Sequence, residues 1–229
     1  MDWRLDEADL SEGQRGLLRA VARSSLADSF YLTGGSNLAG FRFRHRRSDD
    51  LDLFTDGEVP VPEILAVLRS LPGATVEGPD RRYDRYRFLV RLGPDVVRVE
   101  FVRYPFPAVA PREVTVEGLR LDGVADVFAN KVLALIERRE GKDLVDMWKL
   151  AVERGAGALQ QAIADAERKF GVQGLRYALQ GALLAAVRSA APRMKDPGEI
   201  DAVRAWAQAE ARSLAARSLD DDADASGSG

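Results

Sequence analysis

The chain has 229 residues, 46% of them apolar, which suffices for a core in one large domain or in a small catalytic domain plus a helical one. A net charge of −3, from 33 Lys and Arg against 36 Asp and Glu, predicts by itself neither nucleic-acid nor membrane binding. The absence of cysteine excludes disulfides, thiolate metal sites and a cysteine nucleophile, and a single histidine, His45, excludes a His-rich zinc site.

The first part of the chain predicts helices alternating with short strands. Apolar residues recur at helical or strand spacing, and Gly and Pro separate the segments. In chain order we expect a helix from Ser11 to about Ala27, a strand over 30–32, a helix opening at 36–39, a strand over 50–54 and a helix from near Pro62 to Pro72.

From residue 75 to 121 the apolar period becomes two, which predicts strands. Two strands, over about 85–91 and 97–102, are separated by Gly93-Pro94-Asp95, a hairpin sequence. From about residue 123 to 217 the period is helical. We therefore expect a mixed α/β domain over 1–122, a helical domain over 123–218 and a disordered acidic and Gly-Ser tail over 219–229.

Asp50 and Asp52 form a pair of carboxylates on the predicted strand over 50–54. Residues two apart on a strand share a face, so both acids point the same way while Leu51 and Leu53 point to the opposite, buried face. Two close carboxylates repel each other unless a cation lies between them. Hard oxygen ligands of this kind suit Mg²⁺ or Mn²⁺, and the pattern predicts a metal site.

A third ligand is expected from a neighbouring strand, and Glu100 is the candidate. It is the one acid in the apolar and basic run 97–102, where an unpaired glutamate facing the core would be costly. The alternative is a glutamate on a solvent face paired with Arg98 or Arg87. Asp49 points to the other face from Asp50, and we expect it to meet Arg46, Arg47 or solvent.

Gly34, Gly35 and Ser36 lie where a strand gives way to a helix. Backbone N–H groups at such a junction can bind a triphosphate, and the helix N-terminus favours negative charge. Gly-Gly-Ser alone is also ordinary turn chemistry. Its position 14 residues before Asp50, room for one helix and a returning strand, makes the combination specific for an NTP and metal site.

Residues 32–38 (LTGGSNL) and 47–53 (RSDDLDL) resemble the AbiEii/AbiGii-type nucleotidyltransferase toxins, a branch of the polymerase-β-like superfamily that includes the MenT toxins. Residues 131–138 (KVLALIER) and 142–146 (KDLVD) look like the helical signature of that family. Ser36-Asn37 and Lys142 stand where members commonly have Thr-Ala and Arg. The resemblance implies an α+β fold with a polymerase-β-like nucleotidyltransferase core and mixed sheet, followed by an all-helical C-terminal half.

The resemblance also implies a function. It predicts a bacterial, cytoplasmic, metal-dependent nucleotidyltransferase, the toxin of a type IV toxin–antitoxin pair with a cognate antitoxin. An NTP would donate the nucleotide to an acceptor such as the tRNA 3′ end. The alternatives are transfer to a protein hydroxyl (AMPylation) or to an antibiotic, and a silent nucleotide-binding module. No apolar run long enough to span a membrane is present, and no membrane partner is expected.

The helical signature supplies further candidates. Lys131 and Arg138 fall together on the edge of one helix, where Lys131 would bind the β- and γ-phosphates and Arg138 would clamp a phosphate or the Asp143 carboxylate. Asp143 and Asp146 share a helical face, and one of them could orient Lys131 or act as a base; we favour Asp146. Asp143 also fits a helix N-terminal acid stabilised by the macrodipole.

Arginines gather in two stretches of the first domain. Five basic residues lie between the glycines and the carboxylates, and seven arginines against three acids lie between residues 81 and 103. These surfaces would suit the phosphates of RNA, although arginine-rich strand faces are also common solvated surfaces. The first stretch consists of Arg42, Arg44, His45, Arg46 and Arg47.

Overall fold

The computed structural model describes residues 2–187 and 194–226, without the side chains of 217–226. The chain forms two compact units, Met1–Val127 and Phe128–Gly229, which are described separately below. The first unit ends a few residues after the boundary expected at 122, because its last residues include the start of the first long helix.

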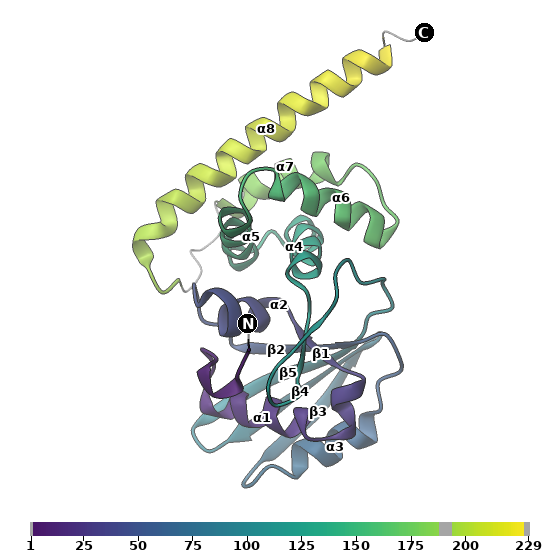
Figure 1. Ribbon diagram of the computed structural model, residues 1–229, viewed down its shortest axis with the longest axis vertical. Helices are drawn as coiled ribbons and strands as arrows, with labels where there is room; N and C mark the ends of the chain where they lie inside the picture. Colours follow the sequence, from purple (N-terminus) through teal and green to yellow (C-terminus); the bar gives the residue numbers. More distant parts are fainter. Residues whose placement is uncertain (1, 188–193, 227–229) are drawn as a thin grey trace. The chain divides into compact units, whose positions relative to one another are not determined.

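The first unit is built around a seven-stranded mixed sheet with the strand order β3-β4-β5-β2-β1-β7-β6 (Figure 1). Its strands are β1 (Tyr31–Thr33), β2 (Asp50–Thr55), β3 (Thr75–Arg82), β4 (Arg85–Leu92), β5 (Asp95–Arg103), β6 (Glu113–Val114) and β7 (Arg120–Leu121). β2 pairs with β5 and β1 with β7 in parallel, whereas the other neighbours are antiparallel. The hairpin expected at Gly93 connects β4 and β5, and the expected α+β class is confirmed.

The helical segments of this unit are η1 (Leu5–Glu7), α1 (Glu12–Ala22), η2 (Ser25–Asp28), α2 (Gly34–Ser36), the π-helical η3 (Asn37–Phe43) and α3 (Val61–Arg69). Ser11 begins α1 with a capping box to Gln14. The helix ends at Ala22 instead of Ala27, because the Ser24 hydroxyl caps the separate turn η2. The helix expected to open at 36–39 begins at Gly34 and becomes π-helical at Asn37.

The core of the first unit lies on one face of the sheet, the face that α1 and α3 cover (Figure 1). Leu51 and Leu53 of β2, together with Val99 and Phe101 of β5, are fully buried there. Because side chains alternate along a strand, Asp50, Asp52 and Glu100 belong to the opposite face. The hydrophobic face therefore holds the strands in register and fixes the spacing of the acids.

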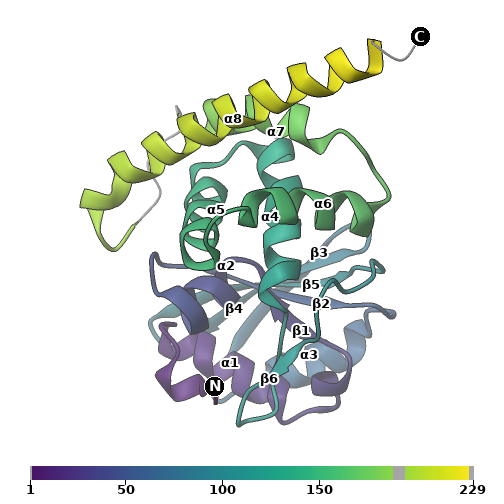
Figure 2. The same ribbon diagram turned by 45° about the horizontal axis from the view of Figure 1, so that its top comes forward.

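The second unit is all helical, as expected for the C-terminal half. Its helices are α4 (Val124–Arg138), which begins in the first unit, α5 (Gly141–Arg154), α6 (Ala158–Phe170), α7 (Leu175–Val187), η4 (Pro197–Glu199) and α8 (Ile200–Ser226). Figure 2 shows α8 running alongside α7. Gly155 and Gly171, both at positive φ, follow the last residues of α5 and α6, and Gly171 has the left-handed conformation that commonly ends a helix.

The acidic tail differs from its expectation. Helix α8 continues to Ser226, beyond the start of the disordered tail expected at 219. Residues 227–229 of the expected tail lie outside the described residues.

Candidate active site

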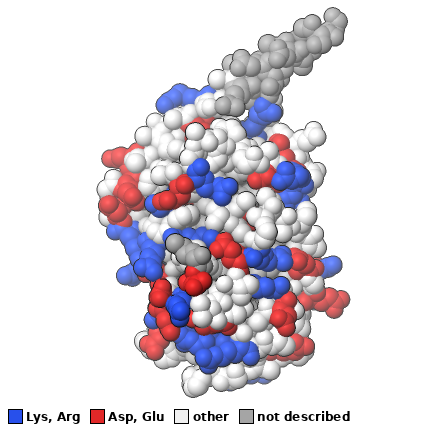
Figure 3. All heavy atoms as spheres, in the orientation of Figure 1, with Lys and Arg blue, Asp and Glu red and all other residues white. Residues whose placement is uncertain are grey.

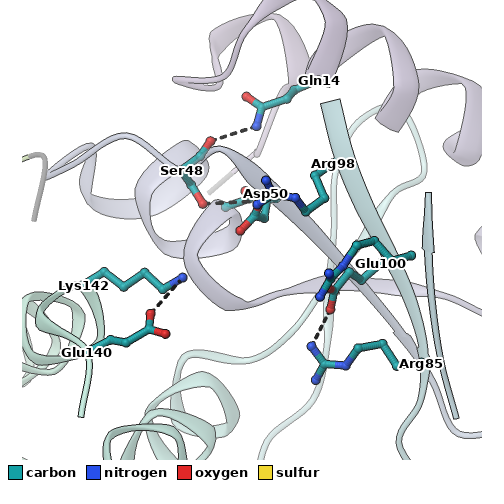
Figure 4. Close-up of polar contacts among 10 residues, drawn as sticks. Gln14, Ser48, Asp50, Arg85, Arg98, Glu100, Glu140 and Lys142 are labelled. Carbon is teal, nitrogen blue, oxygen red and sulfur yellow. Dashed lines mark hydrogen bonds and ion pairs between the residues drawn. The ribbon is translucent and has the colours of Figure 1, made fainter. Parts of the chain in front are cut away.

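Asp50 and Asp52 lie on one face of β2, as the strand period predicts. The burial of β2 alternates, with Leu51 and Leu53 fully buried and the two aspartates half-buried. Packing of the leucines against the core thus keeps both carboxylates on the open face. Asp50 accepts a hydrogen bond from Arg98 at 2.6 Å, and Figure 4 shows the two side chains meeting on that face.

Glu100 lies directly beside Asp52 on the neighbouring strand. In the parallel β2–β5 pairing, Asp52 is opposite Glu100 and Asp50 is opposite Arg98. The Glu100 carboxylate accepts from Arg87 Nε at 2.8 Å and from Arg85 Nη1 at 2.5 Å (Figure 4). Its hydrogen bond to Arg87 raises the pKa of that guanidinium. The pairing with Arg87, one of the alternatives left open by the sequence, is therefore present in the structure.

The glycine turn touches the second carboxylate. Thr33, the last residue of β1, is opposite Asp52 in the antiparallel β1–β2 pairing, and Gly34 follows it with φ 66°. A β-carbon at Gly34 would collide with Oδ2 of Asp52. Glycine is thus needed twice, for its left-handed conformation and for the close approach of the Asp52 carboxylate. Both motifs singled out in the sequence meet at this contact.

A buried arginine lies against the same turn. A β-carbon at Gly35 would collide with the Arg46 guanidinium and would lie 2.9 Å from the Ser48 hydroxyl. Arg46 is only 5% exposed and donates to the backbone oxygen of Arg47 at 2.8 Å. Sequence reasoning placed Arg46 among surface cations, because nothing in the run of basic residues tells which one turns inward.

Ser36 is fully buried, and its hydroxyl donates to the backbone oxygen of Asp50. This bond joins the start of the helix to the start of β2, so the Ser36 side chain is already engaged. The part of Ser36 suited to a phosphate is therefore its backbone N–H, which lies in the first turn of the helical segment that begins at Gly34.

A polar network fixes the other side of the turn. Asn37 donates to the backbone oxygens of Leu32 and Asp122, and the Asp122 carboxylate accepts from the Thr33 hydroxyl at 2.7 Å. Arg42 donates to Asn37 and to the Asp122 backbone oxygen. No local sequence pattern predicts these contacts of Asn37. They hold the turn between β1 and η3 in one conformation.

Only part of the basic stretch before β2 is exposed on the surface. Arg42 is ion paired with Glu113 at 3.0 Å with its side chain 6% exposed, and His45 and Arg46 are buried. Arg44 and Arg47 are exposed. The expectation of a five-residue basic surface is therefore wrong for three of its members, because their side chains are needed to pack the chain between η3 and β2.

The acids of this face have the donor chemistry and the strand positions of a divalent-metal site. Asp50 and Asp52 share a face, and Glu100 is the cross-strand neighbour of Asp52. With the side chains as they stand, no group of three acidic or imidazole residues within 2–187 and 194–216 is gathered closely enough to hold an ion. Arg85, Arg87 and Arg98 balance the carboxylates instead, and each is more than 40% exposed. The strand positions of the three acids could hold a metal ion, provided that these half-exposed arginines leave the carboxylates.

The second unit contains the residues of the helical signature. Lys131 of α4 is buried and contacts the carboxylates of Asp143 at 2.8 Å and Asp146 at 2.6 Å, both fully buried on α5. Of the two roles open to Arg138, the structure has the ion pair with Asp143, at 3.0 Å. Asp143 and Asp146 thus orient Lys131. The expected contact of Lys131 with phosphates and the expected basic role of Asp146 stay predictions.

Lys142 differs from these buried residues. It is half-exposed and ion paired with Glu140 at 3.1 Å, a contact drawn separately in Figure 4. It is the position where the family commonly carries arginine.

A mixed sheet with paired aspartates on one strand, a third acid on the next and a glycine turn against them defines a nucleotidyltransferase. Residues 16–224 match the family described as the nucleotidyl transferase AbiEii toxin of type IV toxin–antitoxin systems. The chain belongs to this family. Membership implies a cognate antitoxin as partner.

Individual proteins are also similar to this chain. An uncharacterized protein of Aquifex aeolicus (strain VF5) is 30% identical over 148 residues, which cover 64% of this chain and 69% of the relative. A solved structure named "putative nucleotidyltransferase from H. pylori" has a TM-score of 0.58 at 19% identity, over 90% of this chain and 97% of that one. JHP933 from Helicobacter pylori has a TM-score of 0.56 at 19% identity, over 94% and 99%. At this identity the two structures support the fold alone.

Among the described residues, no helix has both the length and the apolar character needed to cross a bilayer.

Proposed function

We propose that this nucleotidyltransferase uses Mg²⁺ or Mn²⁺ to transfer a nucleotide from an NTP to an RNA acceptor such as the tRNA 3′ end, and so blocks translation as the toxin of its pair. The observation that carries the proposal is the contact between Gly34 and the Asp52 carboxylate. It supports the proposal because backbone that would suit phosphates lies directly against acids that would suit a metal, the pairing that Mg-NTP binding needs.

The residues of the first unit would divide the work. Asp50 and Asp52 would hold the divalent ions, with Glu100 as the third carboxylate. Backbone N–H groups of Gly35 and Ser36, at the start of a helix, would bind the triphosphate. The ions would supply positive charge to the α-phosphorus and to the departing pyrophosphate. Arg85, Arg87 and Arg98 would leave the carboxylates for solvent or phosphate oxygens as the ions bind.

RNA is the favoured acceptor because of the charge around the site. The arginines that pair with Asp50 and Glu100 stand on the same sheet face as those acids, and exposed Arg47 lies shortly before β2. Cations at this density favour a polyanionic acceptor over an uncharged hydroxyl. A protein hydroxyl or an antibiotic would gain little from them.

The test is a transfer assay with purified protein. Each α-labelled NTP is incubated with Mg²⁺ or EDTA and with either total tRNA or cell lysate, and the products are separated. We expect label in RNA only when metal is present. Asp52→Asn should remove transfer while the far-ultraviolet circular dichroism spectrum stays unchanged, because the amide cannot replace the charge that holds the ion.

Asp49→Asn is the matched control, because Asp49 is an exposed acid that lies directly before β2 in the chain. It should keep full transfer. Binding of Mn²⁺ measured by calorimetry provides a second readout, weakened by Asp52→Asn and unaffected by Asp49→Asn. Label confined to protein bands would reject RNA as acceptor, and full transfer by folded Asp52→Asn would reject the site.

A further inference from the structure

The turn between β3 and β4 has an unusual residue at its tip. Arg82 pairs with Arg85, so the loop consists only of Tyr83 and Asp84. Tyr83 has φ 53°, in the left-handed region, and its residue surface is 96% exposed. The first central position of a two-residue hairpin at positive φ favours Gly, Asn or Asp. A tyrosine there carries backbone strain and places a large ring in water.

Nothing in the described part of the molecule offsets this cost. The Tyr83 ring makes no aromatic or cation–π contact with a described residue, and the bond nearby, from Arg81 Nε at 3.2 Å, goes to its backbone oxygen. Any residue could accept that bond. Strained, exposed positions that packing does not explain are typical of functional sites.

The surroundings of the tip are basic. Exposed Arg81 and Arg82 directly precede the tip, and exposed Arg103 lies 3.9 Å from the Asp84 carboxylate; Asp80 and Asp84 are the two acids nearby in the chain. Arg103 donates its backbone N–H to Asp84 at 3.0 Å, so the end of β5 lies beside the turn. Arg82 makes no ion pair with any described side chain. β3 is an edge strand of the sheet and none of its residues is buried, so the tip offers no apolar patch to a protein partner.

The tip is also continuous with the candidate active site. Arg85, the first residue of β4, follows the turn directly and contacts the Glu100 carboxylate. A polymer held at the turn would therefore pass along the arginines of β4 and β5 toward the carboxylates. Stacking of a base on an aromatic ring with arginines on phosphates is the usual chemistry of single-stranded RNA binding.

We infer that the β3–β4 turn is an RNA-docking element, in which the Tyr83 ring stacks on an unpaired base while Arg81, Arg82 and Arg103 contact phosphates. The inference rests on the proposed RNA acceptor and adds the surface that receives it. The strain at Tyr83 is retained because the ring is needed by the RNA and not by the fold.

Opposite effects on stability and binding test this inference. Tyr83→Gly relieves the strain, so its melting temperature should equal or exceed that of the wild type. Its affinity for labelled tRNA, measured by fluorescence anisotropy without NTP, should fall about tenfold. The KM for RNA should rise while the KM for NTP stays unchanged. Tyr83→Phe should retain RNA affinity, because it keeps the ring.

Two further variants complete the experiment. Arg82→Gln should lower the slope of log affinity for RNA against log salt concentration by about 0.7, the contribution of one phosphate contact to a single strand. Tyr177→Ala, at a half-exposed tyrosine of α7, is the matched control and should bind RNA like the wild type. Unchanged RNA affinity in Tyr83→Gly, with wild-type transfer to RNA intact, would overturn the docking element and leave the proposed function standing. Transfer by the wild type only to protein, with Tyr83→Gly binding the antitoxin more weakly, would reject both in favour of a protein-binding tip.

Discussion

At the scale of single residues, Gly34 is the position on which the site depends. The left-handed backbone and the approach of Asp52 are separate demands, and each alone disfavours a side chain. A methyl group there would displace either the turn or the carboxylate. Displacement of a reacting group by an ångström is enough to slow an enzymatic step strongly.

Gly34→Ala should therefore lower nucleotide transfer on the order of 100-fold. It should also destabilise the protein by about 1–3 kcal/mol, from the strained backbone and the collision with Asp52. Steady-state transfer kinetics and urea denaturation measure the two effects. Gly16→Ala is the control, since Gly16 lies within α1 with open space around its α-carbon. That variant should be fully active and more stable by about 0.5–1 kcal/mol. Equal activity of both variants would show that the turn does not position Asp52.

The candidate acids could be predicted from the sequence, but their partners mostly could not. Alternation along a strand is enough to put Asp50 and Asp52 on one face, and an isolated acid in a basic run drew attention to Glu100. The burial of Arg46 against Gly35 depends on the path of the chain after η3, which no local pattern encodes. Arg85 lies two residues before Arg87, the cross-strand neighbour of Glu100, so its contact with Glu100 depends on side-chain conformation.

At the scale of elements, the ion pairs of Lys131 and Arg138 with Asp143 and of Lys131 with Asp146 join α4 to α5. One ammonium group balances two fully buried carboxylates, while Arg138 reaches one of them from the edge. Removing the lysine would leave negative charge in the interior of the second unit. The loss of one partner from a buried ion pair is among the most destabilising single changes.

Lys131→Met should destabilise the second unit by about 3–5 kcal/mol. Unfolding in urea, followed by Trp148 fluorescence on α5, reports this change. Lys142→Met, at the start of α5, is the control, because Lys142 and its partner Glu140 are both half-exposed. Its effect should be below about 1 kcal/mol. A small effect of Lys131→Met would show that the ion pairs of Lys131 with Asp143 and Asp146 do not stabilise the second unit.

Element types were more predictable than element ends. Period-two alternation and the Gly93 turn identify β4 and β5, and helical spacing identifies the whole second unit. Helix α1 is short because the Ser24 hydroxyl caps the separate turn η2. Helix propensity alone does not predict that this cap ends the longer helix. The strands β6 and β7 have two residues each, too few to carry a period, and they exist because β1 offers an open edge.

At the scale of the whole molecule, many charges of both signs add up to a small net charge. Figure 3 shows Lys and Arg interspersed with Asp and Glu on the face drawn, without one dominant sign. Attraction of RNA would therefore come from local arginines and would be screened over about 10 Å at 0.1 M salt. The net charge of −3 would add a weak repulsion.

We expect the KM for an RNA acceptor to rise steeply with KCl. Each phosphate contact should contribute a slope of about 0.7 in a plot of log KM against log salt concentration for a single strand. The melting temperature over the same salt range serves as the control and should change little. An acceptor KM that does not depend on salt would indicate a small or uncharged acceptor.

The two edge strands of the seven-stranded sheet limit the association of the protein through β-strands at high concentration. β3 carries Pro79, which lacks a backbone donor, and its pairing with β4 shifts between Glu77 and Asp80, while β6 at the other edge has only two residues. Irregular or very short margins give a second copy of the sheet no template to extend. Concentrated preparations should for this reason resist growth of intermolecular β-structure for as long as the native fold persists.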